Sequence, residues 1–277
     1  MAGPHRCNPR SRKWACDVTD AHLAGAGPWQ RVVHREHVWG TVITIEVRDE
    51  QVPDHRAASA IAAAVELSHQ IDAMFSTYRA DSAVTALRTG AIALPEAPSA
   101  VRDVWHACAA AKWRTRGAFD PWAVPGGFDP SGLVKGWAAD RMAETIVAAG
   151  LPNVCINAAG DVTCRGEQAP SEPWSVGIRH PASALDVVRT VRLTDAAVAT
   201  SGRYERGEHL INPRPHGGPI ELDSATVVGP DGALADALAT ALVIAGPEGV
   251  EYFADLPDWS AYLITGTEAT YFGPAFT

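Results

Sequence analysis

Residues 128–140, FDPSGLVKGWAAD, join a loop to a helix near the middle of this 277-residue chain. A Pro-Gly-Gly run precedes them, and apolar residues then recur at near-helical spacing from Val134 to Ala149. A loop that opens a helix presents free backbone N–H groups at the positive end of the helix dipole, and Lys135 adds a full positive charge in the first turn. The stretch therefore predicts an anion site, although most junctions of this kind bind nothing.

The composition is typical of a soluble globular protein, with 47% hydrophobic and 20% charged residues. A net charge of −9 argues against a general nucleic-acid binder and against a polybasic membrane anchor, and no apolar run approaches the ~20 residues of a spanning helix. Residues 1–30 carry Gly, Pro and charge without periodicity and without the apolar core of a secretory signal. We therefore expect a flexible extension over 1–30, one domain over 31–277 and a cytoplasmic location.

The five cysteines are widely spaced, and they form no Cys-x-x-Cys pair. The sequence therefore indicates neither a thiolate zinc site nor a disulfide framework. Cys108 falls on the apolar face of a predicted helix and is expected to be a small core residue.

The predicted helices and strands come in mixed order along the chain, without a regular βαβ rhythm. Apolar stripes predict helices at 55–75, 99–115 and 233–245 in addition to the central one. Runs of β-branched or alternating residues predict strands at 41–47, 154–156, 174–178, 187–193, 196–200, 210–211 and 224–228. The last residues predict a hairpin that closes on Tyr262 and Tyr271. This order favours an α+β fold with mixed or antiparallel sheets and packed helices over a doubly wound sheet.

The helix predicted at 233–245 carries a candidate pair of metal ligands, Asp236 and Thr240. Four residues apart on a helix, the two side chains lie on one face about one turn apart. A carboxylate and a hydroxyl suit a hard cation such as Mg²⁺, which takes oxygen ligands and keeps substrate phosphates in its shell. The alternative is that Thr240 bonds to the carbonyl of Asp236 and that the carboxylate is solvated. The surrounding Ala and Leu residues argue against that alternative, because burying an unpaired carboxylate is costly.

A third informative stretch is ATSGRYERGEHLINP, residues 199–213. Thr200 and Ser201 follow a predicted strand and can offer hydroxyl and amide groups to a phosphate or a flavin ring. His209 is the best placed of the ten histidines to act as a general base, although a single histidine at a strand start is more often structural. The small-residue turn NAAGD, 157–161, either lets the backbone pass close to a ligand or simply turns a corner.

Taken together and in this order, these stretches resemble the ApbE family of FAD:protein FMN transferases. The matching segments are VWGTVITI (38–45), MFSTYRADS (74–82), GAFDP (117–121), DPSGLVKGWAAD (129–140), NVCINAAGD (153–161), WSVGIRHP (174–181), VATSGRY (198–204), HLINP (209–213) and ADALATAL (235–242). Each motif is short, and it is the ordered set that is specific. The resemblance implies an ApbE-like fold with the active site in a cleft between two α/β lobes.

Members of that family bind FAD and Mg²⁺ and attach FMN, through its phosphate, to a threonine or serine hydroxyl of another protein, releasing AMP. The resemblance implies the same reaction here, with FAD as substrate and an acceptor flavoprotein bearing a Thr/Ser flavinylation motif as partner. It implies neither a nucleic-acid partner nor a membrane anchor. Two alternatives stay open, an FAD-binding protein without transfer activity and a Mg²⁺-dependent FAD diphosphatase in which water replaces the acceptor hydroxyl.

The resemblance also implies roles for the matched residues. The backbone carbonyl of Gly132 and the side chains of Asp236 and Thr240 would hold Mg²⁺. His209 matches a histidine proposed to help deprotonate the acceptor hydroxyl, so His209 and Asp236 are the expected catalytic residues. The expected FAD-binding residues, including the two hydroxyl residues after the strand, are Trp39, Tyr78, Ala118, Phe119, Asp120, Asp129, Lys135, Thr200, Ser201 and Ile211. The chain departs from the family pattern at Ala159, where a glycine is common.

Overall fold

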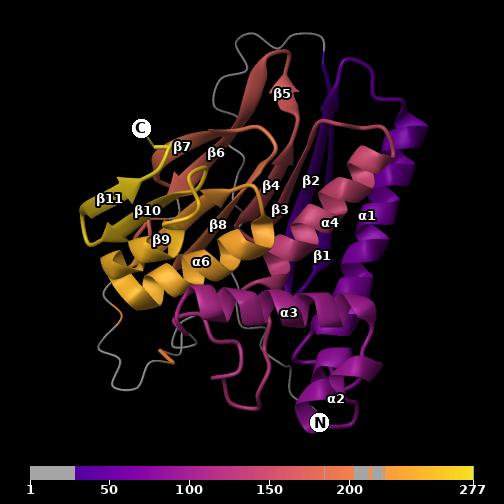
Figure 1. Cartoon of the computed structure of the whole chain (residues 1–277). Coiled ribbons are helices and arrows are strands. Elements are labelled where there is room, and N and C mark those ends of the chain that lie inside the picture. The colour runs from indigo at the N-terminus through magenta and orange to yellow at the C-terminus, as the bar shows by residue number, and fades with distance from the viewer. Residues whose placement is uncertain (1–28, 184, 203–211, 214–219, 221, 277) are drawn as a thin grey trace, which may run out of the picture.

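The structure is a computed structural model that describes residues 29–183, 185–202, 212–213, 220 and 222–276. Within these residues, a layer of helices and a small sheet pack on the two faces of one large antiparallel sheet (Figure 1). The predicted extension over 1–30 lies outside the described residues up to position 28. The α+β prediction is confirmed, and every strand pairing among the described residues is antiparallel.

The large sheet has eight strands. In spatial order they are β1 (Gln30–Val38), β2 (Thr41–Asp49), β3 (Val154–Ala158), β4 (Asp161–Arg165), β8 (Ala196–Gly202), β9 (Ser224–Gly229), β10 (Ser260–Thr265) and β11 (Glu268–Phe272). The final hairpin pairs Tyr262 with Tyr271, as predicted. β3 and β4 are neighbours in the sheet, and they are flanked by β2 and β8, which lie far from them in the sequence. The residues at the turn between β3 and β4 are therefore surrounded by other elements.

Three helices cover one face of this sheet, namely α1 (Asp54–Phe75), α4 (Val134–Ala148) and α6 (Gly232–Ala245). α3 (Ser99–Arg114) packs against α6, and α2 (Ala83–Thr89) packs against α1 (Figure 1). The described part of the chain also contains two 3-10 helices, η1 (Leu94–Glu96) and η3 (Gly246–Phe253). The other face carries the three-stranded sheet of β5 (Glu167–Ala169), β6 (Glu172–Arg179) and β7 (Val187–Leu193).

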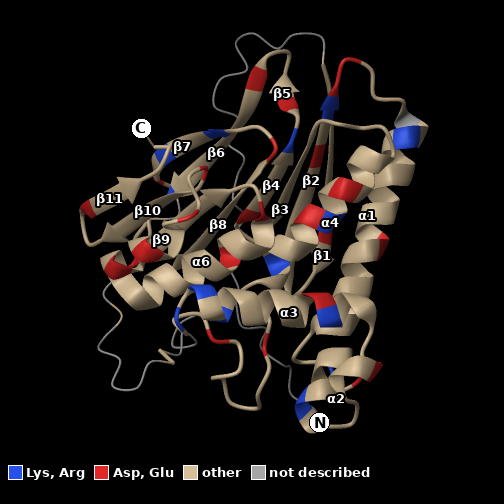
Figure 2. Ribbon diagram, viewed as in Figure 1, with Lys and Arg blue, Asp and Glu red and all other residues tan. Residues whose placement is uncertain are grey.

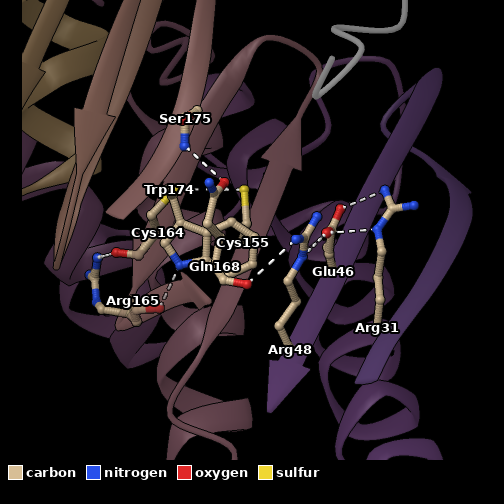
Figure 3. Close-up of polar contacts among 9 residues, drawn as sticks. All are labelled: Arg31, Glu46, Arg48, Cys155, Cys164, Arg165, Gln168, Trp174 and Ser175. Atoms are coloured by element: carbon tan, nitrogen blue, oxygen red, sulfur yellow. Dashed lines mark hydrogen bonds and ion pairs between the residues drawn. The ribbon is translucent and has the colours of Figure 1, made fainter. Parts of the chain in front are cut away.

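Successive side chains of β2 point to opposite faces of the large sheet. Ile43 and Ile45 are fully buried against the helices, whereas Glu46 points to the opposite face and is also buried. The carboxylate of Glu46 accepts hydrogen bonds from Arg31 at 2.8 Å and from Arg48 at 2.6 Å (Figure 3). Burial raises the pKa of Glu46, but the two arginines more than offset this and hold that pKa below its ordinary value.

Among the described elements, those that the sequence did not predict are β1, α2, β4, β5 and the 3-10 helices η1 and η3. β1, QRVVHREHV, carries five charged or histidine residues and is mostly exposed or half-buried, so its apolar alternation is weak. β4 and β5 are short, and each is formed by its pairing with a neighbouring strand. The strand predicted at 210–211 lies outside the described residues.

One helical stretch among the described residues, Gly232–Phe253, is long and apolar enough to cross a membrane by length and composition. The expectation that no apolar run approaches that length is therefore wrong. Within the protein 67% of the apolar window is buried, and a core helix that is apolar on all sides gives the same signature.

Candidate active site

Lys135, in the first turn of α4, lies between two buried carboxylates. Its ammonium pairs with Asp161 at the start of β4 and, at 3.6 Å, with Asp236 of α6. Asp161 is 1% exposed and Asp236 is 2% exposed, while 15% of the lysine side chain is exposed. Because burying a carboxylate without a cation or hydrogen-bond donors costs several kcal/mol, the ammonium is central to this arrangement. The alternative that Asp236 is merely solvated is excluded.

Asp161 is a site residue that the sequence did not single out. It ends the NAAGD turn, in which Ala159 has φ 60° and Gly160 has φ 105°, and the side chain of Asn157 accepts a hydrogen bond from the Gly160 amide. Positive φ at both central residues is the geometry of a two-residue hairpin turn. The turn therefore does change the chain direction, and in doing so it places Asp161 beside Lys135. The sequence signal that could have identified Asp161 was an acidic residue directly after the tight turn that follows a buried strand.

One oxygen of the Asp161 carboxylate has no hydrogen-bond partner among the described residues. This atom, Oδ1, is fully buried, whereas Oδ2 accepts from Lys135. Most buried polar atoms in folded proteins have a partner, so an acceptor in this position is where a bound group or a water would be expected.

A group of hydroxyls adjoins the carboxylates. Thr240, one turn beyond Asp236 on α6, meets Ser201 of β8 with 3.0 Å between the two hydroxyl oxygens. A Cβ built on Gly132 would lie 3.3 Å from the Thr240 hydroxyl and 3.2 Å from the ring of Phe119, so the loop before α4 passes close to the same point. Thr200 faces away from this group and meets Thr226 of β9 at 2.9 Å.

The close crossing of α4 and α6 brings these residues together. A Cβ on Gly136 would lie 1.9 Å from the carbonyl oxygen of Gly232, so the two backbones touch and only glycine fits. Asp140 of α4 accepts hydrogen bonds from the Gly232 amide at 2.7 Å and from the Thr163 hydroxyl of β4 at 2.8 Å. Burial raises the pKa of Asp140, and these hydrogen bonds oppose that rise. The contacts of Asp140 thus join the three elements that carry Lys135, Asp161 and Asp236.

The loop that precedes α4 is held in place by aromatic packing and by a turn that a side-chain hydrogen bond closes. The Phe128 ring is 4.5 Å from that of Trp105 and 5.4 Å from that of Trp122, measured between centroids. Asp129 accepts a hydrogen bond from the Ser131 amide at 2.9 Å, which fixes the turn that precedes Gly132. Burial raises the pKa of Cys108, and the negative charges of Asp236 and Asp129 raise it further, so this core cysteine stays a thiol.

The other described residues predicted to bind FAD have contacts that do not involve Lys135, Asp161 or Asp236. Ala118 lies in the core beside Phe119. Trp39 has φ 57°, and its indole donates to the Ser68 carbonyl at 3.1 Å. The carboxylate of Asp120 pairs with Lys112 at 2.7 Å, and Tyr78 is 93% exposed. His209 and Ile211 lie outside the described residues, so their predicted roles stay predictions.

The donor atoms at the α4–α6 crossing fit a hard cation. No cluster of three or more His, Cys, Asp or Glu side chains that could hold a metal occurs among the described residues. The candidate ligands are instead the Asp236 carboxylate, the Thr240 hydroxyl and the adjacent backbone of Gly132, all oxygen donors. The helix α6 is drawn almost entirely in the colour of uncharged residues (Figure 2), and its sequence contains a single charged residue, Asp236. Mg²⁺ accepts such a set when phosphate and water complete its shell.

Two cavities on the surface involve none of these residues. One lies between α1 and α4 against His55 and Arg56, and the other lies at the C-terminal end of α3 against Trp113 and Arg116. A cleft between two lobes therefore stays a prediction from the resemblance.

The described residues form an α+β fold. Where α4 crosses α6, the Lys135 ammonium lies between two buried carboxylates, and the candidate metal ligands beside it are all oxygen atoms. Solved structures share this fold. "Flavin Transferase ApbE from Vibrio cholerae" superposes with a TM-score of 0.76 over 90% of this chain and 99% of that chain, at 20% identity. The ApbE protein of Thermotoga maritima superposes with a TM-score of 0.76 over 89% of this chain and 98% of that chain, at 23% identity.

The family model described as "ApbE family" matches residues 125–263, just over half of the sequence. The chain therefore belongs to the ApbE family. A protein named FAD:protein FMN transferase in Escherichia coli (strain K12) is 31% identical over 146 residues, which cover 49% of this chain and 41% of that protein. One of the same name in Rhodobacter capsulatus is 39% identical over 123 residues, covering 41% of this chain and 23% of that protein. The matches thus span less than half the length of these curated relatives.

Proposed function

We propose that this protein transfers FMN from FAD to a threonine or serine hydroxyl of an acceptor flavoprotein, in a Mg²⁺-dependent reaction that releases AMP. The observation that carries the proposal is the pairing of Lys135 with two buried carboxylates beside the Thr240 and Ser201 hydroxyls. Membership of the ApbE family and the names of the relatives supply the substrate and the reaction.

Each residue of the cluster has a chemical task in this reaction. The N-terminus of α4 and the ammonium of Lys135 would bind the diphosphate of FAD. The Asp236 carboxylate, the Thr240 hydroxyl and the Gly132 carbonyl would hold Mg²⁺, which when bound neutralises charge on the diphosphate. Ser201 orients the Thr240 hydroxyl through their hydrogen bond. Phe119, packed against Gly132, keeps water from that side of the site.

The transfer step is a substitution at the phosphorus of the FMN half. The acceptor hydroxyl oxygen forms a bond to this phosphorus, the bond from phosphorus to the bridging oxygen breaks, and AMP leaves with that oxygen. The hydroxyl proton passes to a general base, for which His209 is the candidate. A hydroxyl is a weak nucleophile near neutral pH, so its orientation by the protein contributes much of the acceleration.

The test is incubation of the protein with FAD, Mg²⁺ and an acceptor flavoprotein fragment, followed by intact-mass analysis and by nucleotide separation. We expect FMN to be added to the fragment with release of AMP, and we expect both to be lost in Asp236→Asn and after chelation. Asp255→Asn is the matched control, because that carboxylate is exposed and pairs with Arg114 at the surface. Equal amounts of FMN and AMP without an adduct would identify a diphosphatase, and FAD binding with neither product would identify a binding protein. Either result overturns the proposal.

A further inference from the structure

The pairing of β3 with β4 places two cysteines directly opposite each other. Cys155 and Cys164 are register partners, and their sulfur atoms lie 3.6 Å apart (Figure 3). Nothing in the spacing of the cysteines along the sequence indicated a disulfide framework, because this juxtaposition depends on the hairpin turn.

The register also decides which kind of cross-strand pair the cysteines form. The pair that flanks a two-residue turn, here Ala158 and Asp161, exchanges both backbone hydrogen bonds, and hydrogen-bonded pairs then alternate with non-hydrogen-bonded ones. Cys155 and Cys164 form the fourth pair from the turn, which is a non-hydrogen-bonded one. The Cα atoms of such pairs are about 4.5 Å apart, inside the range that a disulfide spans. A small rotation of the side chains would therefore bring the sulfur atoms to bonding distance.

The surroundings of the two thiols are apolar and closed. Both side chains point to the core under β6, where Trp174 and Val176 are buried, and their exposed fractions are 2% for Cys155 and 0% for Cys164. Contact with the Cys164 thiol and burial both raise the pKa of Cys155. Because the thiolate is the reactive form, oxidation of the closed fold is slow, and a disulfide formed there would be equally protected from reductants.

We propose that Cys155 and Cys164 are a site of reversible oxidative modification, forming a cross-strand disulfide by exchange with a small-molecule disulfide. One thiolate attacks the reagent, giving a mixed disulfide and releasing one thiol. The second thiolate attacks the protein sulfur of that mixed disulfide, which closes the Cys155–Cys164 bond and releases the second thiol. The protein is oxidised by two electrons, and the reagent is reduced by the same two. The exchange takes place during folding or through opening of the hairpin, and it ties together the strands that position Asp161. It does not depend on the proposed transferase reaction.

The test is refolding of the full chain in glutathione buffers of graded oxidised-to-reduced ratio, followed by acid quench, alkylation and peptide mapping. We expect a disulfide that joins Cys155 to Cys164, with loss of two hydrogens in mass. It should be reversed by dithiothreitol after unfolding and retained in Cys108→Ala, whose cysteine lies in a different core cluster. The oxidised protein should melt roughly 5–10 °C above the reduced one, since a ten-residue closed loop restricts the unfolded chain only modestly.

Three results would overturn the proposal. The first is free, alkylatable Cys155 and Cys164 after refolding in fully oxidised glutathione. The second is a glutathione adduct on either residue that never converts to the internal bond, and the third is preferential pairing of either residue with another cysteine. All three are read from the unsubstituted chain, so they do not depend on a variant that folds.

Discussion

Replacing Lys135 with methionine would leave Asp161 and Asp236 buried without the ammonium that lies between them. At a separation of 3.6 Å, an effective dielectric constant of about 20 gives a Coulomb energy of about 4–5 kcal/mol for the Lys135–Asp236 pair. Removal of one partner from a buried ion pair costs about 3–5 kcal/mol, so the two magnitudes agree. For a protein of this size the loss corresponds to a fall in Tm of roughly 6–20 °C. Methionine keeps most of the length and apolar volume of the lysine stem, so lost packing adds little.

The assay is thermal unfolding of the parent and the variant, each with chelator and with millimolar Mg²⁺. A divalent cation at Asp236 replaces the missing positive charge, so Mg²⁺ should raise the Tm of Lys135→Met more than that of the parent. Lys112→Met is the matched control, because Lys112 is 41% exposed and pairs with Asp120 at 2.7 Å near the surface. The loss of such a pair costs about 1 kcal/mol or less. A Lys135→Met protein as stable as its parent in chelator, or no more destabilised than Lys112→Met, would refute the electrostatic account of the site.

Three further substitutions test other parts of the structure. Gly136→Ala puts a methyl group 1.9 Å from the Gly232 carbonyl and should destabilise the protein by about 1–3 kcal/mol in thermal unfolding, although alanine normally favours a helix. Glu46→Gln should cost about 2 kcal/mol near pH 7 in urea unfolding. Because the pKa of Glu46 is lowered in the folded state, its stabilisation is complete above the ordinary pKa of 4.5 and is lost as the pH falls through the folded pKa, so parent and variant should converge in acid. Thr240→Val removes the hydroxyl that meets Ser201 and should weaken Mg²⁺ binding by roughly tenfold or more in calorimetry, with little change in Tm.

Patterns within a single segment predicted the four long helices well but missed the seven-residue helix α2. The prediction of 55–75 matches α1, which begins at Asp54, and 233–245 matches α6, which begins at Gly232. Strand β7, Val187–Leu193, has the predicted boundaries. In each case the apolar period of the segment and its flanking turn residues carry the information locally, so the prediction needs no knowledge of the neighbours.

Part of the candidate site was also predicted from sequence. Asp236 and Thr240 were identified because helical spacing places them on one face, and Lys135 because it opens a helix after a loop. The structure brings these three near Gly132 and Ser201, and their roles in binding FAD and Mg²⁺ stay predictions from the resemblance to the ApbE family. The predicted roles of His209 and Ile211 concern residues outside the described part of the chain.

The amino-acid sequence by itself determined the four long helices, most of the strands and the chemical types of residue at the site, since periodicity, turn residues and ordered motifs are properties of local segments. Only the tertiary structure decided that Asp161 shares the Lys135 ammonium with Asp236, that Gly136 touches Gly232, and that Cys155 faces Cys164. These contacts depend on strand register and on the helix crossing, which are set when distant segments pack together to bury apolar surface and to pair charges. The helix start at Lys135 therefore gains its two buried carboxylate partners only because α6 and the β3–β4 hairpin pack against it.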